Sequence, residues 1–129
     1  MAHKLSPSHE DYLEAIYDLS QGSISVRSVD VATRLGVSRA SVNKAVGLLR
    51  DAKLIDQQPY GGITLTEQGH ALAAQVRRCH TILRTFLEKI LGVAPEVAED
   101  EACHIEHSIS DDTLEKLASF VEKTLGVQL

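Results

Sequence analysis

The sequence has no tryptophan, only two cysteines and few aromatic residues, which make up 4% of the chain. Two thiols, Cys79 and Cys103, are too few for the disulfide framework of a small secreted protein. No apolar run approaches the ~18 residues that a membrane-spanning helix needs. Residues 1–10 also lack the apolar core of a signal peptide. We therefore expect a cytoplasmic protein without a membrane partner, whose thiols are buried hydrophobic groups or metal ligands.

Positive charge is scarce, because the formal net charge is −5 at pH 7. It is absent from residues 96–115, which hold eight carboxylates and no lysine or arginine (Glu96, Glu99, Asp100, Glu101, Glu106, Asp111, Asp112 and Glu115). Residues 27–53 have the opposite balance, with six basic and two acidic side chains, a local charge of +4 that leaves −9 for the rest. A basic segment on an acidic body can still face nucleic-acid phosphates.

Helical signals fill the N-terminal half. Ser6 and Pro7 are typical of a helix start, and the apolar spacing that follows continues to Gly22. A short second helix is expected from Ser28, as N-cap, to a stop at Gly36, and Ser38 is expected to cap a third. Two short helices joined by a tight glycine-containing turn are typical of a helix-turn-helix, although an ordinary helical hairpin gives the same pattern.

The stretch that follows favours the first of these interpretations. Residues 54–66 alternate apolar and polar side chains around Pro59-Tyr60-Gly61-Gly62, which predicts a β-hairpin. A hairpin directly after a helix-turn-helix makes a winged helix. We predict a mainly α protein with two domains: a winged helix-turn-helix over residues 1–70, and a helical metal-binding and dimerisation domain over residues 71–129.

Three further helices are expected in the second domain. A long one runs from Thr66-Glu67 to Gly92, a second runs from Pro95 to about residues 108–109, and Ser110 caps the last. The last helix carries an apolar stripe at Leu114, Leu117, Val121 and Leu125. This stripe can serve a homodimer interface or the intramolecular core.

The start of the third helix is the predicted DNA-reading surface. The second helix of a helix-turn-helix places its N-terminal residues at base edges in the major groove. The wing is expected to approach the backbone or the minor groove. Arginine pairs with guanine and asparagine with adenine, while serine and lysine hold phosphates. The predicted DNA-binding residues are Arg27, Ser38, Arg39, Ala40, Ser41, Asn43, Lys44, Tyr60 and Gly61. The alternative is an ordinary solvated face, which the local positive charge and the wing disfavour.

The sequence CHIEH at 103–107 suggests a metal site. Cys103, Glu106 and His107 are spaced i, i+3 and i+4, so a helix presents them on one face. Thiolate, carboxylate and imidazole are ligands of transition metals. His104 points elsewhere and is expected on the surface.

Two other helices offer further ligands. Asp11 and Glu14 are spaced i and i+3 in the first helix, and His80 follows Cys79 in the long helix. One site that draws on three helices would tie metal binding to helix packing, as a switch requires. The alternatives are a solvated helical face for the carboxylates and a core position for His80. Cys79 lies on the apolar face, where we expect packing.

These stretches together resemble the diphtheria toxin repressor family of metal-activated repressors, and in particular its two-domain manganese transport regulator branch. The matching segments are SHEDYLEAIYDL (8–19), VATRLGVSRASVNKAVGLL (31–49), YGGITLTEQGHALA (60–73), RCHTILRTFLEKILGV (78–93) and EDEACHIEHSISDDTLEKL (99–117). Their order and spacing cover nearly the whole chain. The resemblance implies metal ligation by Asp11, Glu14, His80, Glu106 and His107.

The ligand set is a hybrid of two branches. Cys103 stands where the manganese branch has a bridging glutamate, as in the iron-responsive branch, which has methionine at the position of Asp11. Arg84 stands where the iron-responsive branch has a glutamate of its ancillary metal site. Oxygen ligands suit Mn²⁺, and a thiolate shifts preference toward Fe²⁺, Co²⁺ or Zn²⁺. The expected cofactor is Mn²⁺ or Fe²⁺, with Co²⁺ and Zn²⁺ as surrogates.

The function expected from the resemblance is a metal-activated repressor that binds palindromic operators as a homodimer and controls genes of metal uptake or homeostasis. One alternative is a metal-independent winged-helix dimer that senses an organic ligand. Another is a metalloenzyme, because CHIEH is one substitution from the HxxEH hydrolase motif. So many protein ligands leave no open coordination position, so we expect neither an enzyme nor a small organic substrate.

Overall fold

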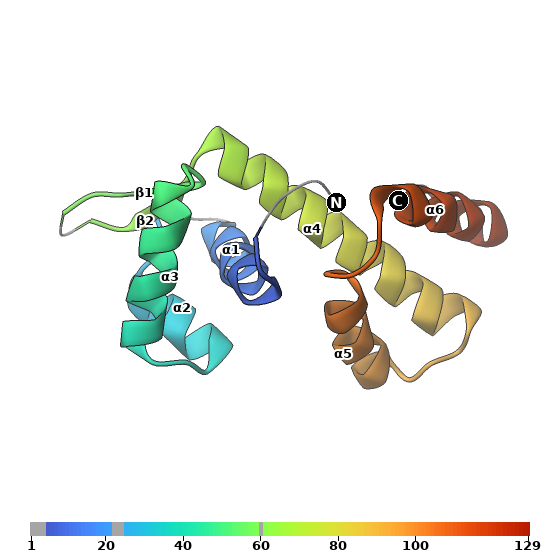
Figure 1. The fold of residues 1–129 in the computed structure, drawn as a ribbon. Coiled ribbons are helices and arrows are strands. Elements are labelled where there is room, and N and C mark those ends of the chain that lie inside the picture. Colours follow the sequence, from blue (N-terminus) through green and yellow to red (C-terminus); the bar gives the residue numbers. More distant parts are fainter. Residues whose placement is uncertain (1–4, 22–24, 60) are drawn as a thin grey trace. The chain divides into compact units, whose positions relative to one another are not determined.

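The computed structural model describes residues 5–21, 25–59 and 61–129 and is mainly helical (Figure 1). The chain divides into two compact units. The N-terminal unit is Lys4–Ala74, and the C-terminal unit contains Gln75–Leu129. Within the described residues, no helix has both the length and the hydrophobicity needed to cross a membrane.

The N-terminal unit begins with three helices: α1 (Pro7–Ser20), α2 (Ser28–Leu35) and α3 (Arg39–Asp51). The Ser6 side chain accepts a hydrogen bond from the backbone N–H of His9, and Pro7 occupies the first turn, which confirms the predicted start of α1. The expected end at Gly22 lies outside the described residues. The prediction that Ser28 caps α2 was wrong: Arg27 is the N-cap, without a side-chain bond, and Ser28 is already helical.

The turn between α2 and α3 has the conformation that its residues predict. Gly36 adopts φ 66° and ψ 37°, a left-handed conformation that costs a residue without a Cβ little, and its N–H bonds to the carbonyl of Ala32. Ser38 then caps α3 by accepting from the N–H of Ser41 at 3.1 Å. The two helices therefore form the helix-turn-helix.

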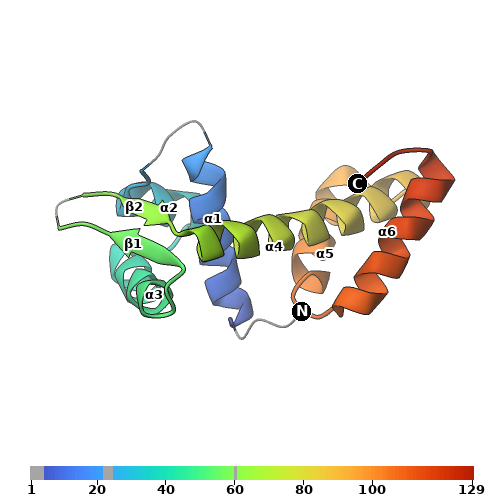
Figure 2. The same cartoon turned by 90° about the horizontal axis from the view of Figure 1, so that it is seen from above.

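The hairpin that follows consists of β1 (Ile55–Gln57) and β2 (Ile63–Leu65). Figure 2 shows the two strands side by side. They are antiparallel, with Ile55 opposite Leu65 and Gln57 opposite Ile63. Val26 forms an additional bridge to Ile63, which sequence reasoning missed. The unit's core joins α1, α2, α3, both strands and the start of α4 (Glu67–Thr85). Its fully buried members include Leu13, Ile16, Val31, Val42, Leu49, Ile55, Ile63 and Ala73. The hairpin, or wing, therefore packs on the same core as α3.

One glycine of this unit is required by close packing. A Cβ added to Gly69 in the first turn of α4 (Glu67–Thr85) would lie 1.8 Å from the backbone oxygen of Leu54. Alanine is the better helix former by about 1 kcal/mol, but overpacking against a backbone costs about 1–3 kcal/mol or more. We expect Gly69→Ala to lower the free energy of unfolding by about 1–3 kcal/mol in a denaturant titration.

Gly47 in α3 provides the matched control. A Cβ there would meet only the Arg50 guanidinium, at 3.9 Å. Gly47→Ala should leave the free energy of unfolding unchanged or raise it by about 0.5–1 kcal/mol, because alanine loses less backbone entropy on folding. Equal stability of the two variants would contradict the packing argument.

The C-terminal unit contains the rest of α4, the π-helix η1 (Phe86–Ile90), α5 (Pro95–Ile105) and α6 (Asp111–Leu125). The expected single long helix to Gly92 therefore changes to π-helical hydrogen bonding in its last turn. The helix α5 also ends earlier than expected, with Glu106 as its C-cap. Ser110 caps α6 as predicted, by accepting from the N–H of Thr113.

A second core holds this unit together. Its buried members are Cys79, Ile82, Leu83, Leu87, Ala98, Ala102, Leu114 and Ala118. Leu114 is therefore intramolecular core, Leu117 packs against the same cluster and Val121 is fully buried. Most of the apolar stripe on α6 thus serves the fold of one chain. Phe120, on the same helix, is exposed.

Candidate metal centre and nucleic-acid interface

His80 lies at the centre of the polar cluster in the C-terminal unit. It comes from α4, and its side chain is buried. Its two ring nitrogens face different partners. Nδ1 lies 3.6 Å from the Glu106 carboxylate and 3.7 Å from the Cys103 sulfur, and Nε2 is 2.9 Å from the Glu99 carboxylate. The ring therefore links α4 to α5 and to the residue that caps it.

The Glu106 carboxylate is the most unusual group in this cluster. Its side chain has 0% exposure, and within the described residues neither oxygen has a hydrogen-bond partner. Its polar neighbours in the C-terminal unit are His80 at 3.6 Å and Nε2 of His107 at 3.8 Å. A buried carboxylate without hydrogen bonds is costly unless a cation compensates its charge. The arrangement therefore favours a bound cation.

The donor types in the cluster fit a transition metal. His80, His107, Cys103 and Glu106 provide two imidazoles, one thiol and one carboxylate. Nitrogen, sulfur and oxygen donors of this kind bind divalent first-row metals such as Fe²⁺, Co²⁺ and Zn²⁺, and oxygen donors suit Mn²⁺. Four of the six predicted ligands thus lie in one unit, with His80 beside Cys103 and Glu106, and His107 beside Glu106.

The charges of this cluster shift its pKa values in opposite directions. The nearby Glu106 carboxylate raises the pKa of His80; burial opposes this shift and Glu99 adds to it. The hydrogen bond from His80 lowers the pKa of Glu99, burial opposes, and Arg84 contributes further lowering. A raised pKa means that protons compete with a metal ion for the His80 ring as the pH falls.

The other two predicted ligands lie on α1 in the N-terminal unit. Asp11 is exposed and Glu14 is buried, one helical turn apart on the same helix. The two remaining predictions agree with the structure: His104 is exposed, and Cys79 is fully buried in the core of the C-terminal unit.

Sequence reasoning missed Glu99. The Glu99 carboxylate lies within hydrogen-bond distance of His80 Nε2, at 2.9 Å, and 3.6 Å from Nε of Arg84. Glu99 precedes Cys103 by four residues, so α5 presents both on one face. This spacing was a signal in the sequence. Glu99 is, however, one of eight carboxylates within residues 96–115, so the spacing did not single it out.

The predicted DNA-reading residues are on the surface of the N-terminal unit. Ser38, Arg39, Ala40, Ser41, Asn43 and Lys44 are all exposed at the start of α3. The Ser38 hydroxyl caps the helix and also donates to Ser41 Oγ at 3.0 Å. Arg39, Asn43 and Lys44 are therefore the exposed long side chains at the start of α3, where they can reach into a DNA groove.

Arg27 and the wing border the same helix. Arg27 is exposed and pairs with Asp30 at 3.2 Å, and Gly61 is exposed at the wing tip. Tyr60 lies outside the described residues. A cleft of about 460 Å³ is lined by residues of the α2 start, α3 and the wing, including Arg27, Arg39 and Gly61. Two arginines thus face a hollow between reading helix and wing.

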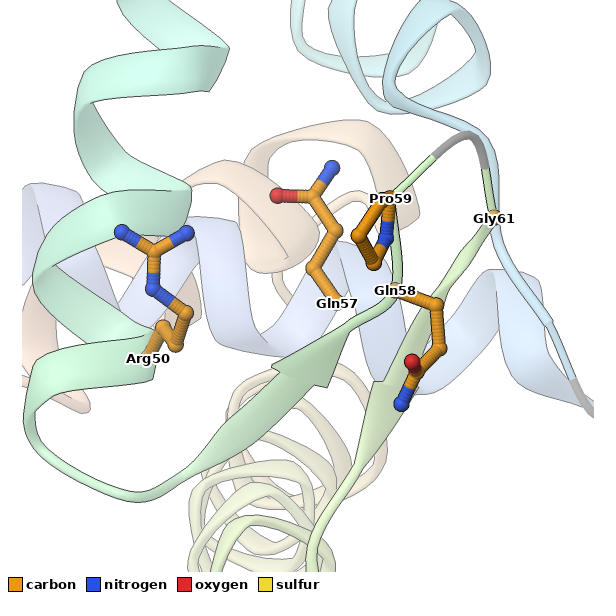
Figure 3. A pocket seen from close by; sticks show the side chains of 5 residues that line it. All are labelled: Arg50, Gln57, Gln58, Pro59 and Gly61. Carbon is orange, nitrogen blue, oxygen red and sulfur yellow. The ribbon is translucent and has the colours of Figure 1, made fainter.

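A second hollow lies between the end of α3 and the wing (Figure 3). It has a volume of about 360 Å³, and its lining residues are Arg50, Gln57, Gln58, Pro59 and Gly61. Arg50 is at the end of α3 and supplies the positive charge, and the glutamines supply amides from the wing. Cationic and amide groups of this kind suit phosphate oxygens, which positions a duplex without reading its sequence.

Two family models together match most of the chain. Residues 4–63 match the N-terminal DNA binding domain of iron dependent repressors. Residues 66–124 match the metal binding and dimerisation domain of the same proteins.

Individual relatives agree with these matches. The transcriptional regulator MntR of Escherichia coli O6:H1 is 40% identical over 114 residues, which cover 88% of this chain and 73% of the relative. An uncharacterized HTH-type regulator of Methanocaldococcus jannaschii is 35% identical over 120 residues, 92% of this chain and 96% of the relative. The solved structure of the manganese regulator SloR superposes with a TM-score of 0.80 at 30% identity, and covers 92% of this chain and 55% of that chain.

A winged helix-turn-helix joined to a helical unit with a buried carboxylate, imidazole and thiol cluster defines a metal-dependent transcriptional regulator. The chain belongs to the diphtheria toxin repressor family, in its manganese transport regulator branch. Members of this family are transcriptional regulators and not enzymes, which excludes the metalloenzyme alternative.

Proposed function

We propose that this chain is a repressor that binds its operator when Mn²⁺ or Fe²⁺ is bound, and that it controls genes of metal uptake or homeostasis. The observation that carries the proposal is the Glu106 carboxylate, which is buried beside His80 and His107 and receives no hydrogen bond from the part of the chain that the structure describes. Such a group is stable when a cation accompanies it. The domains are residues 1–70 for DNA and 71–129 for metal and dimerisation.

The ligand set that we propose has two parts. His80, Cys103, Glu106 and His107 come from the C-terminal unit, and Asp11 and Glu14 come from α1 in the N-terminal unit. Support for the second part is their i, i+3 spacing and the resemblance to manganese regulators. A bound divalent ion supplies positive charge that both sets of ligands share. Ligands from two units let metal affinity depend on how the units are arranged, and linkage makes that dependence reciprocal.

The metal identity follows from the donors. Asp11, Glu14 and Glu106 are oxygen donors, which suit Mn²⁺, and Cys103 adds a thiolate that favours Fe²⁺. Solved structures that are named as manganese regulators support the first of these ions. Co²⁺ and Zn²⁺ serve as surrogates for measurement.

The DNA-binding part of the proposal uses the exposed start of α3. Arg39 and Asn43 read base edges, and Ala40 faces them with a methyl group that can contact a thymine methyl. The DNA backbone is held by Ser38, Ser41, Lys44 and Arg27, and the wing at Tyr60-Gly61 approaches the backbone or the minor groove. A homodimer would place two such helices on a palindromic operator, with half-sites one helical turn apart. The match to a dimerisation domain supports this arrangement.

The test is a fluorescence-anisotropy titration of the protein onto duplex DNA from its own promoter region. It is run anaerobically at fixed salt with chelator, Mn²⁺, Fe²⁺, Co²⁺ or Zn²⁺. We expect the affinity to rise about 5–150-fold with the cognate ion, as for typical allosteric coupling of 1–3 kcal/mol. Equal affinity with chelator and with every ion would reject metal activation, and would favour a winged-helix regulator of an organic ligand.

A further inference from the structure

We propose that Glu99 is a positioning residue of the metal centre: it holds the Nε2 side of His80, so that the metal binds Nδ1 beside Cys103 and Glu106. This inference rests on the proposed function, because it concerns how that site is organised. Glu99 is thereby assigned a role outside the ligand set.

The geometry around the imidazole separates the two roles. Cys103 Sγ and the Glu106 carboxylate lie 3.7 and 3.6 Å from Nδ1, whereas the Glu99 carboxylate lies 2.9 Å from Nε2. The two ring nitrogens point to different sides of the ring, and one ion binds only one of them. A metal-ligating histidine commonly donates its other N–H to a carboxylate, which fixes the tautomer and the ring orientation. Glu99 has the position of that carboxylate.

A competing assignment makes Glu99 a ligand. His80, Glu99 and Cys103 offer donor atoms within 4.8 Å of one another, close enough to surround an ion. An ion at Nε2 would leave the side of the ring that Cys103 and Glu106 face. It would also leave the buried Glu106 carboxylate without its cation. The positions of Cys103 and Glu106 therefore favour Nδ1.

Arg84 strengthens the same conclusion. Its guanidinium Nε lies 3.6 Å from the Glu99 carboxylate, and another of its nitrogens lies 3.4 Å from Glu88. Arg84 follows His80 by one turn of α4, so helix geometry places a fixed cation beside Glu99. A second metal ion at Glu99 would be repelled by the positive charge of Arg84. Arg84 therefore already compensates the negative charge of Glu99, so this side of the site does not need a second metal ion.

The first arm of the test uses the metal-free protein. We expect ¹⁵N imidazole NMR at alkaline pH, where the ring is neutral, to show His80 with its proton on Nε2. Glu99→Gln should keep that tautomer, since the amide oxygen still accepts from Nε2–H, and Glu99→Ala should lose its dominance. Glu99 is 55% exposed, so neither variant is expected to unfold. A proton on Nδ1 in the wild type, or an unchanged tautomer in Glu99→Ala, would overturn the proposal.

The second arm measures the affinity for Co²⁺ alone by titration of its visible absorption. Loss of an outer partner typically weakens metal affinity about 10–100-fold, which we expect for Glu99→Ala. Glu99→Gln should retain most of the affinity and the wild-type Co²⁺ spectrum. Glu101→Ala removes an exposed carboxylate from the same helix and should match the wild type.

The outcomes separate the inference from the function on which it rests. Equal losses in Glu99→Gln and Glu99→Ala, with an altered Co²⁺ spectrum in both, would make Glu99 a ligand and overturn the positioning role. Wild-type affinity in Glu99→Ala would overturn it as well. If the wild type binds neither Co²⁺ nor Mn²⁺, the proposed function fails, and the tautomer measurement still decides whether Glu99 orients His80.

Discussion

We expect Glu106→Ala to abolish the effect of metal on DNA affinity. The wild type is expected to bind its operator about 5–150-fold more tightly with metal, and in the variant this ratio falls to one. The physical reason is the position of the carboxylate, which is fully buried without a hydrogen bond in the described residues and lies between His80 and His107. The measurement is the anisotropy titration with chelator and with Mn²⁺.

Metal-induced stabilisation gives an independent readout for the same variant. At a free metal concentration of 100 times Kd, binding to the native state stabilises it by about 2.7 kcal/mol. We expect this rise in the free energy of unfolding for the wild type and none for Glu106→Ala. The matched control is Glu101→Ala, which removes the same charge from the exposed side of α5 and should behave as the wild type.

His107→Ala should behave like Glu106→Ala, because His107 is the second imidazole beside the buried carboxylate. Retention of the full metal effect by both variants would refute the assignment of the site. Loss of DNA binding with chelator as well as with metal would instead indicate a folding defect, which the denaturant titration detects.

Local signals predicted most of the helix boundaries. Ser6, Ser38 and Ser110 each accept a hydrogen bond from a backbone N–H three residues on, as their positions before apolar periodic segments indicated. Ser28 has the same sequence signal but does not cap, because the chain becomes helical one residue earlier, after Arg27. A capping residue thus predicts that a helix begins, and the flanking backbone decides the position.

The π-helical turn at Phe86–Ile90 could not be predicted. Its apolar residues continue the face of α4, and the periodicity that identifies a helix does not distinguish hydrogen bonds to i−4 from those to i−5 over a single turn. The same limit applies to the end of α5, where Glu106 keeps helical backbone angles although the helix ends at Ile105.

The metal centre was partly predictable for a related reason. Spacing along one helix places Cys103 and Glu106 on one face, and both lie beside His80 in the structure. The pairing of Glu99 with His80 depends on the packing of α5 against α4, a distance that one-dimensional spacing does not contain. The sequence signals on this side of the site were the i, i+4 spacing of Glu99 and Cys103 and the identity of Arg84.

Arg39→Ala is expected to weaken DNA binding by the metal-loaded protein about 5–150-fold, which corresponds to the 1–3 kcal/mol of a bidentate contact to a guanine. Arg39 is the first helical residue of α3, exposed, and it lines the cleft of about 460 Å³ beside the wing. The metal affinity of the variant should equal that of the wild type, since Arg39 is not one of the proposed ligands.

The kind of contact is decided by comparing Arg39→Ala with Lys44→Ala on operator DNA and on a scrambled duplex. A lost base contact reduces the preference for the operator, whereas a lost phosphate contact weakens both duplexes alike and reduces the slope of log affinity against log salt by about 1. We expect the first result for Arg39 and the second for Lys44. Arg78→Ala, which removes an exposed arginine of the C-terminal unit that pairs with Glu115, is the control for net charge. If Arg39→Ala loses no more affinity than Arg78→Ala, the start of α3 is not the reading surface, and the basic segment binds DNA through charge alone.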